Sequence, residues 1–262
     1  MRVEGKVVVV TGAGSGIGAA MARRFASEGA SAVVVADLHL EAAQAVAAEC
    51  TSRDGNRVGH AHAIDVADAD ALRALIERVE AAVGPIGLFC SNAGLGLRSG
   101  EPVTAEVWQR LWDVHVQAHV TAADALVPRM LARGGGWLLC TASAAGLLTQ
   151  FDAPYAVTKH AAVAYAEWLS IRYGDEGLGV SCLCPGAVDT PLLRAETPER
   201  LASMAAGVAP MSPDAVADAV VQGLAEERFL ILTHPQVADW MQRKAAEPQR
   251  WIRGMRRSFK GM

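Results

Sequence analysis

Long apolar stretches are absent from this sequence of 262 residues, because no run approaches the roughly 18 apolar residues that a membrane-spanning helix requires. The first ten residues, MRVEGKVVVV, also lack a basic segment followed by a long apolar region and a cleavage site of small residues. Internal repeats, low-complexity segments and linkers are absent as well. We therefore expect no membrane partner, and a cytoplasmic location is the default expectation.

The sequence also has few cysteines and a small net charge. The five cysteines include no CxxC pair and are not accompanied by clustered histidines, so we expect no metal site. Most lie in apolar runs typical of buried strands, which favours reduced core residues: Cys50, Cys90, Cys140, Cys182 and Cys184. The formal net charge of −4 gives no reason to expect a nucleic-acid partner. The basic C-terminal stretch QRWIRGMRRSFKGM is interpreted as a solvated or subunit-facing helix.

Short β-branched runs alternate with longer segments of helical period along the whole sequence, a pattern typical of repeated βα units and a parallel sheet. The runs predict strands over 6–11, 32–36, 59–64, 87–91, 136–141, 179–184 and 229–233. Helices are expected over 17–28, 40–52, 68–83, 104–133, 154–173, 213–226 and 236–257. The hydrophobic content of 52% suits a large core. We predict one α/β domain over residues 1–262, a doubly wound sheet of about seven parallel strands with helices on both faces.

A glycine-rich turn, TGAGSGIG, joins the first expected strand to the first expected helix. The N-terminus of a helix exposes unpaired N–H groups and a partial positive charge, and therefore attracts phosphate. Gly12 can adopt a turn conformation closed to other residues, Gly16 lets backbone approach a pyrophosphate, and Gly18 allows the helix to pack on the strand. Because no lysine follows the glycines, a mononucleotide P-loop is disfavoured.

Asp37 ends the second strand, about 20 positions after the glycine turn, where an acid can accept hydrogen bonds from both hydroxyls of an adenosine ribose. Its charge would repel a 2′-phosphate, so NAD is favoured over NADP. Capping of the next helix is the alternative role, compatible with the first. Asp65, after the third strand, could lie near an adenine amino group or cap the helix from 68. The SNAG segment at 91–94 ends the fourth strand at the carboxyl edge, where open α/β sheets bind ligands.

Three further residues carry acid–base chemistry. Tyr155 and Lys159 lie four residues apart on an expected helix and share a face. A lysine cation beside a tyrosine favours the phenolate, so we expect the pKa of Tyr155 to fall from about 10 toward neutrality. Ser143, after the fifth strand, could donate a hydrogen bond to a carbonyl oxygen while Tyr155 exchanges the proton. A YxxxK pair occurs by chance in many helices, and a serine after a strand is often a helix cap. The combination is specific because Ser143 and the YxxxK pair follow the glycine turn, Asp37 and the NAG segment in this order.

Taken in order, these motifs resemble the short-chain dehydrogenase/reductase family over roughly residues 5–235. The matching stretches are TGAGSGIG, DV at 65–66, NAG at 92–94, SAAG at 143–146, YAVTK at 155–159 and PGAVDT at 185–190. The resemblance implies a Rossmann-type sheet and NAD(P)-dependent oxidoreduction of an alcohol–carbonyl pair. It also implies that Tyr155 is the acid/base, that Lys159 tunes it and binds the nicotinamide ribose, and that Ser143 orients the reacting oxygen.

The cofactor site that follows from the motifs and the resemblance is extended. It comprises Gly12, Ser15, Gly16, Ile17, Gly18, Asp37, Asp65, Val66, Asn92, Ala93, Gly94, Tyr155, Lys159, Pro185, Gly186, Val188 and Thr190. The resemblance implies that Val188 and Thr190 hold the nicotinamide carboxamide. In oxidation, the Tyr155 phenolate would take the hydroxyl proton as hydride leaves for NAD, and reduction would reverse both transfers.

One position departs from the family pattern. An asparagine is usual within a VN step of the long helix after NAG, and LWDVHVQAHV places His115 there. In the family that asparagine is held to kink the helix and to anchor a water linking the lysine to solvent. His115 could hold the same water through a ring nitrogen or relay the proton itself, and we expect activity to survive. His115 and His119 have the spacing of a metal pair, but without a third ligand a structural role is favoured.

Three segments at the carboxyl edge are expected to select the substrate: 95–99, 146–152 and 191–211, the last resembling the family's mobile lid. Their apolar residues suggest a hydrophobic secondary alcohol or ketone, with a candidate pocket made of Leu95, Leu97, Leu147, Phe151, Leu192 and Leu193. The same residues would suit a lid that packs on its own domain. Arg98 or Arg194 could meet a carboxylate or be solvated.

The resemblance implies a dimer or tetramer, with the helices over 104–133 and 154–173 shared between subunits. The tail from Pro235, which carries Trp240 and Trp251, could cover a neighbouring subunit's pocket. Two other functions stay open at this point. A nucleotide-binding regulator without turnover is motivated only by His115, and an epimerase or dehydratase of nucleotide sugars would need a substrate domain for which this chain has little room.

Overall fold

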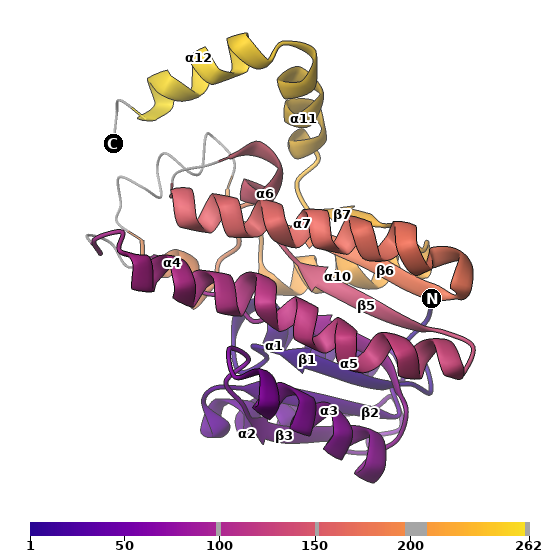
Figure 1. Cartoon of the computed structure of the whole chain (residues 1–262). Coiled ribbons are helices and arrows are strands. Elements are labelled where there is room, and N and C mark those ends of the chain that lie inside the picture. The colour runs from indigo at the N-terminus through magenta and orange to yellow at the C-terminus, as the bar shows by residue number, and fades with distance from the viewer. Residues whose placement is uncertain (98–100, 150–151, 197–208, 260–262) are drawn as a thin grey trace.

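The computed structural model describes residues 1–97, 101–149, 152–196 and 209–259, and Figure 1 shows their arrangement. Within these residues, seven parallel strands form one sheet in the order β3-β2-β1-β4-β5-β6-β7. They are β1 (Val7–Thr11), β2 (Ala32–Asp37), β3 (Gly59–Ala63), β4 (Ile86–Ser91), β5 (Gly136–Thr141), β6 (Leu178–Cys184) and β7 (Leu230–Leu232). The predicted strands and the doubly wound α/β class are confirmed.

Helices cover both faces of this sheet. The helices α3, α5 and α7 share one apolar core with one face, and α1, α2 and α10 share a second core with the other. Figure 1 shows α5 and α7 running over the front of β5 and β6. The larger helices are α1 (Gly16–Ser27), α2 (Leu40–Glu49), α3 (Ala69–Ala82), α4 (Ala105–Trp112), α5 (Ala118–Ala132), α7 (Ala153–Tyr173), α10 (Pro213–Ala225), α11 (Gln236–Ala246) and α12 (Pro248–Phe259).

Burial on both faces explains why the central strands are apolar throughout instead of alternating. All five residues of β1, VVVVT, are buried, and so are the first five of β2, AVVVAD. In a parallel sheet covered by helices on both sides, side chains pointing either way reach a core. The five cysteines are likewise buried as free thiols, as predicted. No helix among the described residues is long and apolar enough to cross a bilayer.

The strand order determines where a ligand can bind. From β1 the sheet grows outward through β2 and β3, and the chain then returns to place β4 on the other side of β1. This reversal separates the loops that follow β1 and β4, and so opens a crevice at the carboxyl edge of the sheet. The ends of β5, β6 and β7 extend the same edge beyond β4.

The helices differ from the sequence prediction at two places. The helix expected over 104–133 is interrupted by a π-helical turn, Asp113–Gln117, between α4 and α5. The helix expected over 236–257 is divided into α11 and α12, because Pro248 has no N–H to donate and disfavours helical backbone at Glu247. The one-turn helices α6 (Ala145–Leu148) and α8 (Pro191–Arg194) were not predicted, since four residues are too few to show a period.

Candidate active site

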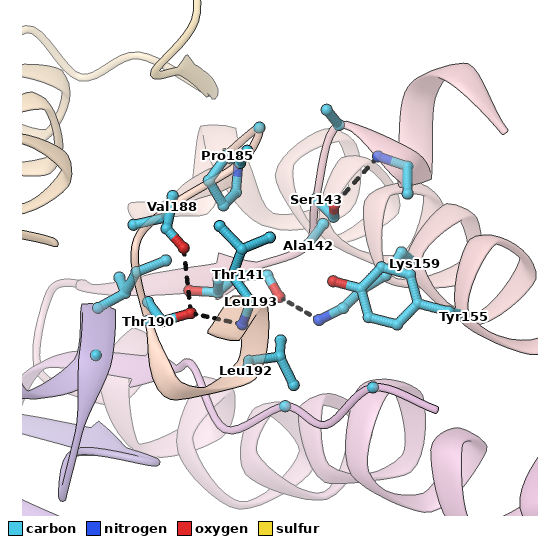
Figure 2. A pocket seen from close by; sticks show the side chains of 18 of the residues that line it. Thr141, Ala142, Ser143, Tyr155, Lys159, Pro185, Val188, Thr190, Leu192 and Leu193 are labelled. Atoms are coloured by element: carbon cyan, nitrogen blue, oxygen red, sulfur yellow. Dashed lines mark hydrogen bonds between the residues drawn. The ribbon is translucent and has the colours of Figure 1, made fainter. Parts of the chain in front are cut away.

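A cavity of about 310 Å³ lies at the carboxyl edge of the sheet. Its wall begins at the glycine turn after β1, follows the ends of β2, β4, β5 and β6, and finishes on α11 beyond β7. Figure 2 shows part of this wall from close by. Strand ends that are far apart in the sequence therefore face one space, as expected for an open α/β sheet.

The turn between β1 and α1 leaves little room for side chains at its glycine positions. Gly12 and Gly16 have φ angles of +62° and +52°, which other residues rarely adopt. A Cβ atom on Gly18 would lie 2.2 Å from the carbonyl oxygen of Gly12, so the helix approaches the strand with bare backbone. Ser15 is the N-cap of α1, and its side chain makes no capping hydrogen bond. The first-turn N–H groups of α1 are thus available to an anion in the cavity.

Asp37 stands beside this turn at the end of β2. Its Oδ2 accepts the N–H of Gly14 at 2.8 Å, and its Oδ1 accepts the N–H of His39 at 3.0 Å. The N-cap residue of α2 is His39, so Asp37 fastens the two loops to each other and is not itself the helix cap. Because the half-buried Asp37 lines the cavity, its negative charge faces that end of the ligand space.

Thr11 and Asn92 hold the ends of β1 and β4 together. The side-chain amide of Asn92 donates to the carbonyl oxygen of Thr11 at 3.0 Å. The Thr11 hydroxyl accepts the N–H groups of Asn92 and Ala93 at 3.0 and 3.1 Å. Asn92 and Gly94 line the cavity, whereas Ala93 lies behind it, where a Cβ on Gly12 would come within 2.7 Å of the Ala93 Cα. The NAG segment is therefore fixed against the glycine turn.

Two residues predicted to contact the cofactor, Asp65 and Val66, do not line the cavity. Asp65 is exposed and accepts the N–H of Ala67 at 2.9 Å, and Asp68, not Asp65, caps α3. Val66 is buried in the core that contains α3. The reason is topological, because β3 is the edge strand and its end lies two strands away from the glycine turn.

Ser143, Tyr155 and Lys159 line one part of the cavity, as Figure 2 shows. Tyr155 and Lys159 project from adjacent turns of α7, and Ser143 follows β5. The Lys159 Nζ donates to the carbonyl oxygen of Thr141 at 3.0 Å and lies 5.8 Å from the centre of the Tyr155 ring. The Ser143 hydroxyl accepts the N–H of Ala145 at 3.1 Å, which leaves its own hydrogen free to donate. A substrate oxygen bound here could exchange a proton with the phenol.

The ionisation of the pair differs from the sequence prediction. Burial raises the pKa of Tyr155 above its ordinary value, while interaction with the Ser143 hydroxyl acts in the opposite direction. Burial also lowers the pKa of Lys159 to about 8, so the amine stays largely protonated at neutral pH. The raised pKa of Tyr155 is opposite to the predicted lowering, because the phenol is removed from water and the Lys159 amine is directed at the Thr141 carbonyl.

The loop after β6 closes over the glycine turn. The Thr190 hydroxyl donates to the carbonyl oxygen of Val188 at 3.3 Å and accepts the N–H of Leu193 at 3.3 Å, as the N-cap of α8 (Figure 2). A Cβ on Gly16 would lie 3.0 Å from the Thr190 Cγ2, so this loop touches the turn across the cavity. Pro185, Gly186, Val188 and Thr190 all line the cavity, as predicted.

Comparisons with known proteins agree with this arrangement. The sequence profile of the short chain dehydrogenases matches residues 6–201, which is more than half of the chain. This chain belongs to the short-chain dehydrogenase/reductase family. Its NAG segment, Ser143 and YxxxK pair all fall within the matched region.

Curated relatives and a solved structure match most of the chain. The 1-deoxy-11-beta-hydroxypentalenate dehydrogenase of Streptomyces exfoliatus is 38% identical over 239 residues, covering 89% of this chain and 85% of that protein. A cyclohexanol dehydrogenase of an Acinetobacter species is 35% identical over 195 residues, covering 73% and 76%. A short chain dehydrogenase/reductase of Burkholderia phymatum, solved in complex with NAD, superposes with a TM-score of 0.83 at 28% identity, covering 95% and 96%.

This short-chain dehydrogenase is therefore an oxidoreductase that acts on an alcohol–carbonyl pair with a nicotinamide cofactor. The regulator without turnover is not supported, because the named relatives are dehydrogenases. The epimerase or dehydratase of nucleotide sugars is not supported for the same reason.

His115 occupies the π-helical turn of this short-chain dehydrogenase and is fully buried. Its Nε2 accepts the N–H of Leu95 at 3.1 Å, so the proton is on Nδ1, which donates to the Thr158 hydroxyl at 3.0 Å. The Thr158 hydroxyl in turn donates to the carbonyl oxygen of Pro154 at 2.8 Å. The ring also meets the Tyr155 ring edge-on, with centroids 5.4 Å apart. Both nitrogens are used, which does not support the expected water ligand or proton relay.

His115 instead connects two parts of the site. One partner, Leu95, belongs to the cavity wall after β4, and the other, Thr158, lies one turn from Tyr155 on α7. His119, the second member of the spaced pair, is also buried, and neither of its ring nitrogens has a hydrogen-bond partner among the described residues. Within the same residues, no group of three or more side chains could hold a metal ion.

The apolar end of the cavity follows the prediction in part. The predicted residues that line it are Leu95, Leu97, Leu192 and Leu193. Leu147, on α6, packs against two apolar clusters and does not line the cavity. Phe151, Arg98 and most of the predicted lid lie outside the described residues. Arg194 is exposed and pairs with Asp189 through two hydrogen bonds, at 2.7 and 2.9 Å.

Four further lining residues, Gly96, Asp152, Pro191 and Glu196, lie in the segments expected to select the substrate but were not named individually. Lining residues outside those segments that were not predicted are Thr141, Ala142, Ala144, Ala145, Ala187, His234, Gln236 and Val237. Trp240 also lines this chain's own cavity, although we expected the tail to cover a neighbouring subunit's pocket. A signal for His234 was present, because it is a polar residue directly after a strand, in the position that drew attention to Asp37 and Ser143.

His234 fastens the last strand to the loop after β6. Its Nδ1 accepts the N–H of Gly186 at 3.2 Å and lies 2.7 Å from the Thr233 hydroxyl. The imidazole ring packs closely against the backbone of Gly186, since a Cβ on Gly186 would lie 2.9 Å from Nδ1. Burial lowers the pKa of His234, which keeps the ring neutral and Nδ1 able to accept.

Replacing His234 by leucine is expected to weaken NADH binding on the order of tenfold, because the N–H of Gly186 loses its acceptor and the loop that carries Val188 and Thr190 loosens. His234→Asn, which offers an amide oxygen in place of Nδ1, should restore much of the affinity. The titration of each variant with NADH, followed by fluorescence, measures the effect. Equal affinities for the leucine variant and the unaltered protein would contradict this role.

Proposed function

We propose that this short-chain dehydrogenase transfers hydride between NAD and a hydrophobic secondary alcohol or ketone, within a single catalytic domain. The observation that carries the proposal is that Ser143, Tyr155 and Lys159 share one cavity with the glycine turn and Asp37. The turn fits a dinucleotide, because it lines the cavity and the first-turn N–H groups of α1 have no side-chain cap and can bind a pyrophosphate.

The residues of this chain then have distinct roles. Bound NAD supplies the hydride acceptor in oxidation and, once reduced, the hydride donor in reduction. Ser143 donates its free hydroxyl hydrogen to the substrate oxygen. Tyr155, as phenolate, accepts the alcohol proton while the carbon loses its hydride, and in reduction Tyr155 returns that proton to the oxygen. The positive charge of Lys159 favours the phenolate once the alcohol has been bound.

The preference for NAD rests on Asp37. Its carboxylate faces the cavity beside the glycine turn, where it can accept hydrogen bonds from the two ribose hydroxyls and repel a 2′-phosphate. No arginine or lysine lies among the described cavity residues near this end to attract a phosphate in its place.

Asp37→Ser is expected to raise the KM for NAD and lower the KM for NADP, changing the ratio of the two kcat/KM values by on the order of 10- to 100-fold. Asp37→Asn is the matched control, since it keeps one oxygen for the loop N–H groups but removes the charge. If charge decides the preference, both variants will accept NADP more readily. Initial rates with each cofactor measure the ratio, and a ratio unchanged in both variants would overturn the NAD assignment.

The proposed substrate follows from the apolar end of the cavity. Leu95, Leu97, Leu192, Leu193 and Val237 face it, and apolar walls of this kind favour a hydrophobic ligand. The names of two relatives, a cyclohexanol dehydrogenase and a 1-deoxy-11-beta-hydroxypentalenate dehydrogenase, point in the same direction.

Incubation of the protein with NAD and a panel of secondary alcohols tests the whole proposal. The panel should include cyclic terpenols, steroids, aryl alcohols, polyols and 3-hydroxyacyl esters, with NADH formation as the readout. We expect turnover of hydrophobic cyclic alcohols and little turnover of polyols. The opposite order would reject the substrate class but retain the dehydrogenase, whereas NADH binding with no turnover at all would reject the activity.

We further propose that the protein is a homo-oligomer, a dimer or tetramer, assembled through α4, α5 and α7. Large apolar side chains on these helices are exposed in the single chain: Trp112, Val157, Trp168 and Ile171. Sedimentation velocity should give a mass at least twice that of the chain, and Ile171→Glu, at a position 77% exposed, should lower it. A monomer at micromolar concentration would contradict the assembly.

A further inference from the structure

Part of the cavity wall is supplied by α11. Gln236, Val237 and Trp240 line the cavity, and their spacing of one and three residues places them around the first turns of this helix. In Figure 1, α11 leaves the end of β7 and stands beside α6. The cavity therefore ends on a helix that lies outside the sheet and carries none of the catalytic residues.

Both ends of α11 are fixed to the elements that carry the active site. At its start, the N–H of Val237 donates to the carbonyl of His234, whose ring holds the loop after β6. Near its end, the Lys244 Nζ donates to the carbonyl oxygen of Leu147 at 2.6 Å, at the end of α6. The wall is thus anchored on two sides, and its position relative to Ser143, which precedes α6, is set by these contacts.

The indole of Trp240 lies between the cavity and an apolar cluster. The cluster consists of buried Ala144, Leu148 and Val237, with Trp240, Met241 and Trp251 packed against them. Trp251 belongs to the same cluster but does not line the cavity. Trp240 therefore contacts both this apolar cluster and the ligand space, whereas Trp251 contacts only the cluster.

We propose that Trp240 determines the size of the alcohol that this enzyme accepts, by closing the cavity at the α11 end so that compact ring alcohols fit and larger ones do not. This inference rests on the proposed function. It follows from placement, because Trp240 is the largest side chain on this wall and its indole packs against the apolar cluster around Leu148, which restricts its withdrawal from a larger ring. A hydrophobic pocket discriminates about 10- to 200-fold for one methylene group.

Trp240→Ala tests the proposal with a series of secondary alcohols of increasing ring size, from cyclopentanol through cyclohexanol to cyclododecanol. We expect the ring size with the highest kcat/KM to increase, and the ratio of kcat/KM for large over small rings to rise at least tenfold. The gain should appear mainly in KM, since Trp240 takes no part in the proton and hydride transfers.

Trp251→Ala is the matched control, because it removes the same side chain from the same cluster without touching the cavity. It should lower the melting temperature and leave the ring-size preference unchanged. Trp240→Phe, a smaller change, should give an intermediate preference if Trp240→Ala folds poorly. An equal change in kcat/KM for every ring size, or the same shift in both alanine variants, would overturn the proposal.

Binding of the corresponding ketones to the NADH complex, measured by calorimetry, separates this inference from the proposed function. If no alcohol is oxidised but Trp240→Ala shifts the ketone preference toward larger rings, the proposed activity fails and the size limit stands. If alcohols are oxidised and neither the rates nor the ketone affinities depend on Trp240, the size limit fails and the activity stands.

Discussion

Tyr155→Phe is expected to lower the kcat for alcohol oxidation about a thousandfold, which is within the range for loss of a positioned acid–base group. The phenyl ring fills the same space, but no oxygen remains to take the proton that the substrate loses. NADH affinity should change little, because the glycine turn, Asp37 and the Thr190 loop are untouched. Stopped-flow rates of NADH formation and NADH titration together measure the two effects.

Tyr165→Phe is the matched control for this experiment. Tyr165 lies on the same helix and is stacked on Trp168, 6.1 Å between ring centres, away from the cavity. It undergoes the same chemical change, and its kcat should stay near that of the unaltered protein. If Tyr155→Phe retained a tenth or more of the activity, another group would have to transfer the proton.

Below pH 6.5, His115 and His119 are together expected to contribute a loss of about 2.7 kcal/mol per pH unit to the free energy of unfolding. Burial lowers the pKa of His119 to about 3 and that of His115 well below its ordinary value. In the unfolded chain both titrate near pH 6.5, so below that pH the unfolded state binds two protons that the folded state does not. Stability therefore rises with pH up to about 6.5 and is lost as pH falls.

His119→Leu should remove half of that slope, about 1.4 kcal/mol per pH unit, because one buried titrating ring is gone. It should not reduce stability at pH 7.5, since neither ring nitrogen of His119 has a hydrogen-bond partner among the described residues. Urea unfolding at pH 7.5, 6.0 and 5.0 measures both quantities. Thr121→Val, at a buried non-titrating position on the same helix, is the control and should leave the slope unchanged. An unaltered slope in His119→Leu would show that His119 does not resist protonation in the folded protein.

His115 shows which properties of a site residue can be predicted from the sequence and which cannot. Its position within the motif order identified a departure from the family pattern, and the expectation that it acts near the catalytic lysine was reasonable from the sequence alone. Its partners, the Leu95 N–H and the Thr158 hydroxyl, come from segments 20 residues before it and 43 residues after it. Their approach depends on how α7 packs on the π-helical turn, which no local pattern encodes.

The C-terminal helices give a second example. The amphipathic period over 236–257 correctly predicted helical structure. It did not predict the division into α11 and α12, although Pro248 within the pattern is a signal for such a break. That α11 would line the cavity of its own chain was not predicted, because an apolar helix face indicates burial without indicating the surface that covers it. The contacts of His234 with Gly186 and of Lys244 with Leu147 decide that surface.

The sequence by itself determined the elements whose causes are local: the buried strands, the glycine turn, Asp37 at a strand end, and the spacing of Tyr155 and Lys159. Each depends on backbone sterics or a short periodicity, and so survives in any arrangement of the chain. Only the tertiary structure decided that Asp65 lies away from the cavity and that burial raises the pKa of Tyr155. These properties depend on strand order and on the exclusion of water, which arise from contacts between residues distant in the sequence.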